Sequence, residues 1–258
     1  IILLALAVTT SGLNAQTRKT QRYKGKATAV KPQSTDNLPA MNPTARALFD
    51  DMLASTQKVF VIDSTVVDID NVLAEIPLPV TYGKFVKYNS FFNTDKADDS
   101  YVFVNGFGNR CYYTEMGSDS IARLYTRDMV GNQWGEPQPI ESVNGKFNDI
   151  SFPFMSSDGQ TLYFAGVSDE EGLGKRDIYM TKIEAVEGKF LNAENIGLPF
   201  NSPSDDFAYI VADADKLAWF ASTRNQPEGK VCVYTFVPTD TRQNYDALTI
   251  EEKKLHSL

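Results

Sequence analysis

The stretch Ser151-Phe-Pro-Phe-Met-Ser-Ser-Asp-Gly-Gln-Thr-Leu-Tyr-Phe-Ala165 is the clearest structural signal in the chain. Two runs rich in aromatic and apolar residues flank the pair Asp158-Gly159. An Asp-Gly pair between two such runs is the strongest short-range signal of a β-hairpin, because the glycine readily adopts the positive φ that a tight turn requires. The stretch therefore predicts a strand, a turn at Asp158-Gly159 and a second strand.

Weaker copies of this hairpin lie on both sides of it. On the C-terminal side, Phe164-Ala165 corresponds to Phe220-Ala221 at a spacing of 56 residues. On the N-terminal side, Met155–Phe164 corresponds to Val104–Tyr113 at a spacing of 51 residues. Further matches pair Leu124-Tyr125 with Ile178-Tyr179, Ile178-Tyr179 with Val233-Tyr234, and Trp134–Ile140 with Phe190–Ile196. These matches predict a repeat protein whose insertions lie in the loops.

Each repeat is predicted to contain four short strands, which in the central copy are Phe152–Met155, Thr161–Ala165, Asp177–Thr181 and an irregular one near Phe190–Ile196. Four strands repeated about every 50 residues is the period of a β-propeller blade. The fold class is therefore predicted to be all-β, a β-propeller of four-stranded blades over residues 58–240 with short flanking helices. Three repeats are recognisable, and a further one near residues 58–80 is degenerate. A continuous β-sandwich is the alternative.

The degenerate repeat has a specific predicted role. Its runs Val59–Ile62 and Thr65–Val67 are β-branched and aromatic, and Ile76–Val80 has the composition of an edge strand that contains prolines. The third clear repeat has no fourth strand of its own after Gly229–Phe236. We expect Val59–Val67 to supply that strand, so that the start of the domain pairs with its end.

Four segments of the central copy carry a family resemblance, namely Phe152-Pro153, Ser156–Gln160, Leu162–Phe164 and Asp177–Tyr179. Together they resemble the Ser-Pro-Asp-Gly-Lys repeat of TolB-like, WD-repeat-like β-propellers, which are exported proteins of the Gram-negative cell envelope. The resemblance spans residues 88–238 and is strong only in the central copy, because the outer copies replace the Asp-Gly turn with Gly106–Gly108 and Asp213–Asp215. It implies a non-enzymatic scaffold that binds proteins or other envelope components.

The first 41 residues are predicted to lie outside the folded domain. Ile1–Val8 is an apolar run followed by small and polar residues up to Ala15, which is the pattern of a secretory signal peptide over residues 1–15. The run is far shorter than the ~20 apolar residues of a membrane span. Residues 16–41 are polar and basic, so we expect a disordered arm. The protein is therefore expected to be exported to the periplasm or an outer-membrane-associated position, without spanning the membrane.

Two short helices are predicted beside the repeats. Asn42-Pro43 has the form of a helix start, with Asn as the N-cap and Pro at the first helical position. Apolar residues follow at helical spacing, which predicts an amphipathic helix over Thr44–Ser55, within the segment 42–57. Thr249-Ile-Glu-Glu252 has the form of a capping box, so the segment 241–258 is expected to begin a C-terminal helix.

The composition argues against several classes of function. The net charge of −8 gives no footprint for nucleic acid. The single histidine, His256, follows the repeats, so a Ser-His-Asp or Cys-His mechanism has no support. Neither Cys111 nor Cys232 has a neighbour at metal-ligand spacing, and we expect no metal or other cofactor. The two cysteines are expected either to pair or to be buried thiols.

The candidate ligand-binding residues are carboxylates and arginines that precede or connect strands: Asp149, Asp205, Asp206, Arg176 and Arg224. In a propeller they would gather on one face at the mouth of the central channel, opposite the Asp158-Gly159 turn. Such a cluster could bind a polar ligand, a cation or a peptide. The structural alternative is that Asp149 and Asp205 accept backbone N–H bonds where blades meet.

These features predict an exported, non-enzymatic binding module, whose partner is an envelope protein or a peptidoglycan or polysaccharide component. The alternative function is a carboxylate-dependent glycan hydrolase that uses acids on the channel face. Such an enzyme needs two carboxyl groups facing each other across a site. A third reading is a scaffold for a larger assembly.

Overall fold

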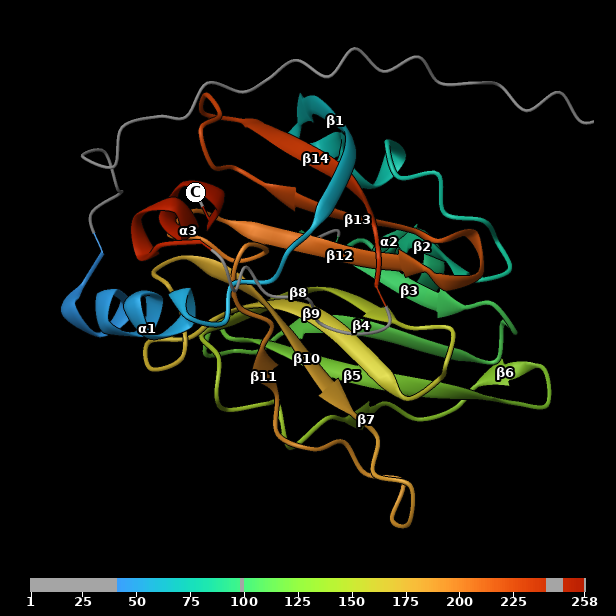
Figure 1. The fold of residues 1–258 in the computed structure, drawn as a ribbon. Helices are drawn as coiled ribbons and strands as arrows, with labels where there is room; N and C mark the ends of the chain where they lie inside the picture. The colour runs from blue at the N-terminus through green and yellow to red at the C-terminus, as the bar shows by residue number, and fades with distance from the viewer. Residues whose placement is uncertain (1–40, 98–99, 240–247, 258) are drawn as a thin grey trace, which may run out of the picture. The chain divides into compact units, whose positions relative to one another are not determined.

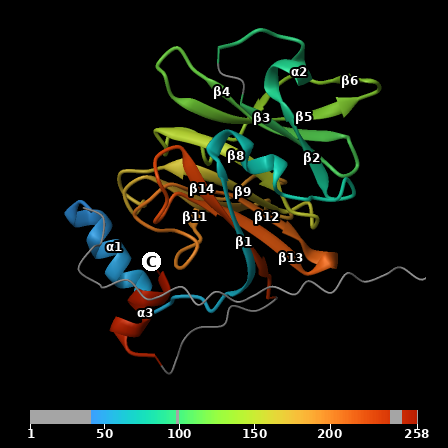
Figure 2. The same ribbon diagram turned by 90° about the horizontal axis from the view of Figure 1, so that it is seen from above.

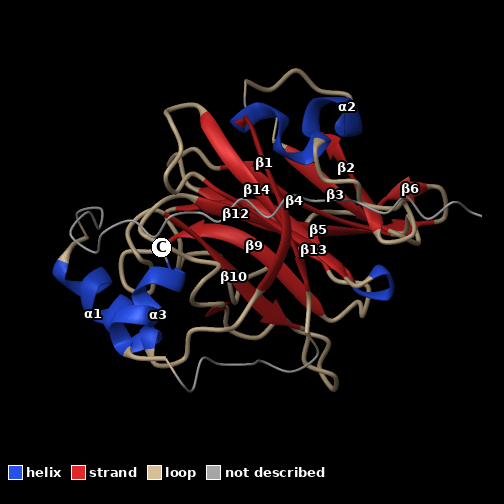
Figure 3. Cartoon of the chain, turned by 45° about the horizontal axis from the view of Figure 1, so that its top comes forward, coloured by secondary structure: helices blue, strands red, loops and turns tan. Residues whose placement is uncertain are grey.

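The computed structural model of the protein describes residues 41–97, 100–239 and 248–257. Strands dominate these residues, and the helices are short (Figure 3). The all-β prediction is confirmed. The predicted signal peptide (1–15), the predicted arm up to residue 40 and residues 241–247 of the C-terminal segment lie outside the described residues.

The central sheet has the strand order β11-β10-β9-β8 and is antiparallel throughout. Its strands are β8 (Asp149–Met155), β9 (Thr161–Val167), β10 (Arg176–Lys182) and β11 (Glu194–Asn195). The predicted hairpin is confirmed between β8 and β9. The Asp158 carboxylate accepts hydrogen bonds from the backbone N–H groups of Gln160 and Thr161, and Gly159 has a φ of +66°. The turn residues therefore act as their chemistry predicted.

The sheet that precedes it has the order β2-β3-β4-β5-β6, and β7 also pairs with β5. Its strands are β2 (Gly83–Lys87), β3 (Tyr101–Asn105), β4 (Arg110–Met116), β5 (Ala122–Val130), β6 (Gln133–Trp134) and β7 (Gln138–Pro139). The irregular fourth strand has the same form in both sheets. In the first sheet Trp134 and Pro139 both pair with β5. In the central sheet Asn195 pairs with β10, and Phe190 pairs with Ile183, the residue directly after β10. The predicted match between the two segments is confirmed.

The last sheet has the order β1-β14-β13-β12 (Figure 1). Its strands are β1 (Phe60–Asp68), β12 (Asp206–Ala212), β13 (Leu217–Ser222) and β14 (Lys230–Val237). The early strand β1 pairs with β14 along its length, from Phe60 opposite Val237 to Asp68 opposite Lys230. The prediction that the start of the domain supplies the missing strand is confirmed. A short 3₁₀ helix, η3 (Asp213–Asp215), replaces the Asp-Gly turn between β12 and β13.

The degenerate repeat contributes one strand, β1, and not the second strand that was predicted for it. After β1 the chain forms the 3₁₀ helix η2 (Ile69–Ala74), and the segment Ile76–Val80, predicted as a strand, contains no strand residues. Its two prolines, Pro77 and Pro79, have no backbone N–H to donate to a neighbouring strand. The described residues therefore form three sheets.

A backbone bulge recurs in two of the repeats and was not predicted from the sequence. Phe152 in β8 and Ala208 in β12 both have positive φ values, of 51° and 54°, and both lie at a register shift. These two bulges occupy corresponding positions, 56 residues apart. Repeated bulges re-aim side chains in the same way in each copy, and here the Phe152 ring stacks on Phe207 of the next sheet at 4.9 Å.

Two asparagine side chains extend the sheets in the same repeated manner. The Asn144 amide bonds both the N–H and the C=O of Leu124, at 2.8 and 3.0 Å. The Asn201 amide bonds both groups of Ile178, at 2.7 and 2.8 Å. Each amide bonds both backbone groups of one residue, and the same two carbonyls also accept from the backbone N–H groups of Ile140 and Ile196, at 3.0 and 3.2 Å.

The three sheets share one apolar core. Strand β8 contacts β3, β4 and β5 of the preceding sheet and β12 of the following one (Figure 2). Aromatic pairs bridge the sheets, including Phe103 with Phe154 at 5.0 Å and Tyr163 with Tyr209 at 4.7 Å. Cys111 and Cys232 are both free and buried, so the thiol alternative is the one observed.

Three helices flank the sheets in the described residues: α1 (Pro43–Leu53), α2 (Tyr88–Phe92) and α3 (Ile250–Ser257). The Asn42 side chain caps α1 by accepting from Ala45 N–H at 2.8 Å, as predicted. The capping box of α3 is also confirmed, with reciprocal bonds between Thr249 and Glu252. Helices α1 and α3 contact each other. No helix within the described ranges has the length and apolar character that crossing a membrane requires.

Candidate functional site

The predicted site residues gather at one end of the central and last sheets. Asp149 begins β8 and Arg176 begins β10, and both lie opposite Val167 of the intervening strand β9. Because directly opposed residues point to the same face of a sheet, the two side chains project together across about 10 Å, the width of two strand spacings. A long arginine side chain spans that gap. Strand pairing thus places an acid and a base from positions 27 residues apart side by side.

These residues form a partly exposed cluster, here named the Arg176 cluster, that consists of Asp149, Lys175, Arg176 and Asp205. The Arg176 guanidinium bonds the Asp149 carboxylate, and its Nη1 lies 3.8 Å from Asp205 Oδ1. Lys175 Nζ lies 3.7 Å from Asp205 Oδ2. The side chains of Asp149, Arg176 and Asp205 are 32%, 27% and 30% exposed, so water and a partner can reach them. Two acids and two bases leave the cluster without net charge.

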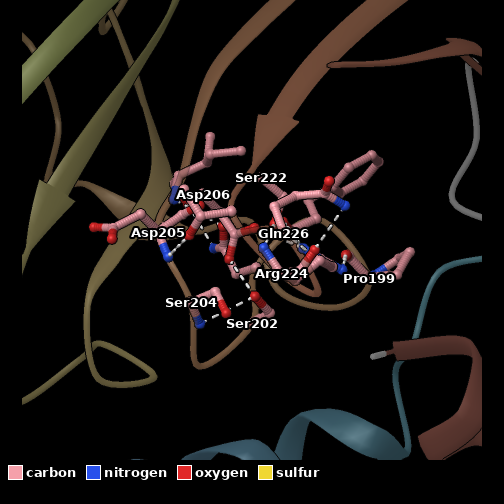
Figure 4. Close-up of polar contacts among 12 residues, drawn as sticks. Pro199, Ser202, Ser204, Asp205, Asp206, Ser222, Arg224 and Gln226 are labelled. Atoms are coloured by element: carbon pink, nitrogen blue, oxygen red, sulfur yellow. Dashed lines mark hydrogen bonds and ion pairs between the residues drawn. The ribbon is translucent and has the colours of Figure 1, made fainter. Parts of the chain in front are cut away.

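Asp206 and Arg224 form a second, buried ion pair beneath this end of the last sheet (Figure 4). Arg224 Nη2 lies 2.7 Å from Asp206 Oδ1, and the two side chains are 10% and 0% exposed. Ser202 Oγ donates to the other Asp206 oxygen at 2.7 Å. Arg224 also donates to Ser222 Oγ and to the carbonyl oxygens of Pro199 and Phe200, each at 2.7 Å. The pair joins the segment at Pro199 and Phe200 to the end of β13, and both of its side chains are almost wholly withdrawn from solvent.

A third carboxylate, Asp177, lies nearby and was missed as a site residue. Its side chain is buried, and its Oδ2 accepts from Leu173 N–H at 2.6 Å and from Asn195 Nδ2 at 3.3 Å. Its Oδ1 has no hydrogen-bond partner among the described residues. Burial, and then the charge of Asp206, hold the pKa of Asp177 well above its ordinary value. The Asp177-Ile178-Tyr179 motif marked the repeat but gave no sign of this burial.

The structure thus divides the five predicted residues by burial. Asp149, Arg176 and Asp205 meet at the surface, whereas Asp206 and Arg224 are buried and paired with each other. The structural alternative holds for Asp205, whose Oδ1 accepts the backbone N–H of Arg176 from the neighbouring sheet at 3.4 Å. Asp205 therefore joins two sheets while leaving part of its carboxylate exposed.

The Arg176 cluster suits exchange of ion pairs with a partner better than hydrolysis. Glycan hydrolysis by two carboxyl groups requires one of them to be protonated and both to face a substrate. Here Asp149 and Asp205 both interact with the one Arg176 guanidinium, so an arginine and not an open space for a substrate bridges the two carboxylates. No protein-family model matches the chain, and no curated protein matches its sequence.

Proposed function

We propose that the protein is an exported, non-enzymatic binding module of the cell envelope, and that its sheets are blades of a TolB-like, WD-repeat-like β-propeller. The central and last sheets have four strands each, and the first sheet has two more. Three features support the blades: the sequential strand order, the bulges repeated at Phe152 and Ala208, and the pairing of β1 with β14. Propellers have ~4 to 8 blades. The described residues form three sheets, so the propeller part of the proposal rests on the sequence resemblance and on these repeated features.

The observation that carries the binding proposal is the exposed Arg176 cluster above a buried ion pair. The buried Asp206–Arg224 pair ties the loop at Pro199 and Phe200 to the end of β13. Asp205, next to Asp206 in sequence, is thereby positioned at the surface together with Arg176. A rigid surface with both signs of charge favours a partner that also presents both signs, because rearranged ion pairs give orientation and specificity. An envelope protein has this chemistry, and so does a peptidoglycan component with charged peptide stems.

The proposal is tested by retention from a solubilised envelope extract on the immobilised protein. Wild type is compared with Arg176→Ala and with Lys175→Glu. The matched control is Lys189→Glu, because Lys189 is also an exposed lysine paired with an acid, Glu187, but lies in the loop between β10 and β11. We expect wild type and the control to retain the same envelope component, and both cluster variants to lose it.

The hydrolase alternative predicts a different result. If the purified protein turns over a glycan substrate, Asp149→Asn and Asp205→Asn should each abolish the turnover and leave the melting temperature nearly unchanged. That outcome would overturn the proposal of a non-enzymatic module. If the same variants unfold the protein, the two carboxylates serve the structure alone and the cluster is not a binding surface.

A further inference from the structure

A pocket of about 330 Å³, lined by both polar and apolar groups, lies at the opposite end of β8 from the Arg176 cluster. The first residue of β8, Asp149, belongs to the cluster, and its last residue, Met155, lines the pocket. The seven residues of β8 separate the two by about 20 Å. The pocket is therefore a distinct site, formed between the β3–β4 turn of one sheet and the β8–β9 turn of the next.

The walls of the pocket are fixed before any ligand arrives. Asn105 Oδ1 accepts from the backbone N–H groups of Asn109 and Arg110, which fixes the β3–β4 turn. The η3 turn between β12 and β13 holds two further residues of the pocket wall. Asp215 N–H donates to Tyr82 Oη at 3.2 Å, and Ser157 Oγ donates to Asp213 Oδ2 at 2.7 Å. A preformed site loses little entropy when a ligand binds.

The β3–β4 turn also lies directly against the segment that leads into β2. A Cβ atom at Gly106 would lie 1.9 Å from the carbonyl oxygen of Thr81, so no side chain fits between them. Both residues line the pocket. The close contact fixes the position of the turn, and with it the position of Phe107, the residue that follows.

The side chains around the pocket combine neutral polar chemistry with one exposed aromatic ring. Arg110 bonds the Asp128 carboxylate through two nitrogens, so the only strong acid and base of the lining cancel in charge. The Asn109 amide contributes a donor, since its Nδ2 bonds to no other described residue while its Oδ1 accepts from Asn105. Phe107 is 89% exposed at the tip of the turn and also lines the pocket.

This combination matches a carbohydrate. A sugar ring presents an apolar face of C–H groups, which an aromatic face attracts through its negative quadrupole. It also presents adjacent hydroxyls, each of which can both donate and accept a hydrogen bond. They can therefore donate to the Asp128 carboxylate and accept from the Arg110 guanidinium and the Asn109 amide. A charged ligand would gain little from a neutral lining, and a volume near the lower end for ligand pockets fits one or a few sugar rings.

We infer that the pocket between the β3–β4 and β8–β9 turns is a carbohydrate-binding site for a neutral saccharide. Phe107 stacks on the sugar, and Asn109, Arg110 and Asp128 bond its hydroxyls. This inference does not depend on the Arg176 cluster, which lies at the other end of β8.

Binding is measured with chitotriose, maltotriose and cellotriose as probes, by saturation-transfer NMR and by calorimetric titration of the full chain. We expect at least one trisaccharide to bind at concentrations up to about 10 mM. Phe107→Ala should weaken that binding by about 3- to 10-fold, and Asp128→Ala by about 10-fold or more. Val186→Ala is the matched control, because Val186 is 88% exposed and apolar but lies in the β10–β11 loop.

Each result decides the inference. Weakening by both pocket variants, with Val186→Ala and Arg176→Ala binding as wild type does, supports it and leaves the envelope proposal to its own test. The inference is overturned if none of the three sugars binds, or if Phe107→Ala and Asp128→Ala both bind as wild type does. It is also overturned if a blocked tri-alanine peptide binds the pocket and the sugars do not. Unchanged melting temperatures show that the variants are folded.

Discussion

Two acid–arginine pairs lie at the same end of neighbouring sheets and differ in how far water reaches them. Asp149 and Arg176 remain about one-third exposed, and the guanidinium is shared with Asp205. Asp206 and Arg224 are almost wholly buried, and serine and carbonyl groups complete their hydrogen bonds. Burial, more than residue type, separates a surface that can exchange partners from a contact that holds loops together.

The repeat makes the comparison sharper, because Asp206 stands where the central copy has Ile150. Both residues lie near the start of the first strand of their sheet, Ile150 opposite Gly166 and Asp206 opposite Ser222. Ile150 is 1% exposed and belongs to the apolar core. The same backbone position is thus filled by apolar packing in one copy and by a buried ion pair in the next. The ion pair is an addition of the last sheet.

The largest expected effect is from Arg224→Ala. The substitution leaves the Asp206 carboxylate buried without a cation and removes a donor from the carbonyls of Pro199 and Phe200. We expect the free energy of unfolding to fall by about 3–5 kcal/mol, measured by urea denaturation at pH 7. A loss under about 1 kcal/mol would mean that burial does not distinguish the two pairs.

The next effect is on the pH dependence of stability, through Asp177. Its pKa is raised in the folded protein, so the stability that its protonated form contributes is fully present below the ordinary carboxyl pKa and is lost as the pH rises through the raised pKa. Asp177→Asn mimics the protonated form. Compared with wild type, the variant should gain stability progressively above about pH 4, by about 1.4 kcal/mol for each unit of raised pKa.

Urea denaturation of both proteins between about pH 4 and pH 9 checks this dependence. A difference between variant and wild type that stays constant over the range would show that the Asp177 carboxyl titrates normally. Asp149→Asn is the matched control, since Asp149 is an exposed carboxylate at the same end of the sheet.

A smaller effect is expected from Arg176→Ala. Exposed ion pairs contribute about 0–1 kcal/mol, so the melting temperature should change little even though Asp149 and Asp205 both lose a partner. Thermal unfolding followed by circular dichroism measures it. A loss as large as that of Arg224→Ala would assign the Arg176 cluster to the support of the fold.

The smallest effect concerns the two thiols. Burial raises the pKa of Cys111 to about 12 and also raises that of Cys232. Since the thiolate is the reactive form, neither thiol of the native protein should react with a colorimetric disulfide reagent at pH 8, and both should react in denaturant. Rapid reaction of either thiol in the native state would contradict the buried setting.

Local sequence chemistry predicted much of the fold correctly. The Asp158-Gly159 turn, the Asn42 cap of α1 and the irregular fourth strands all follow from residues that are close in sequence. The pairing of β1 with β14 was predictable because a repeat without its last strand requires one from elsewhere. The prediction of a strand at Ile76–Val80 was wrong. The β-branched residues at its two ends favour a strand, but its two prolines have no backbone N–H groups with which to pair.

The candidate site was predictable only in part. The acids and arginines were identified from their places before strands, and strand pairing brought them together. The sequence did not show that Asp206 and Arg224 turn inward, or that Asp177 is buried. The bulges at Phe152 and Ala208 were also invisible, because neither residue type favours a positive φ.

The sequence by itself determined the repeat, the strand alternation and the chemistry of each turn, because these depend on hydrophobic period and on local backbone preferences. Only the tertiary structure decided which charges face water. The exposure of a charged side chain is set by loops that come from more distant parts of the chain: the carbonyls of Pro199 and Phe200 bond Arg224, and the Asn195 amide bonds Asp177. Long-range packing therefore divides one set of acids and arginines into a buried support and an exposed binding surface.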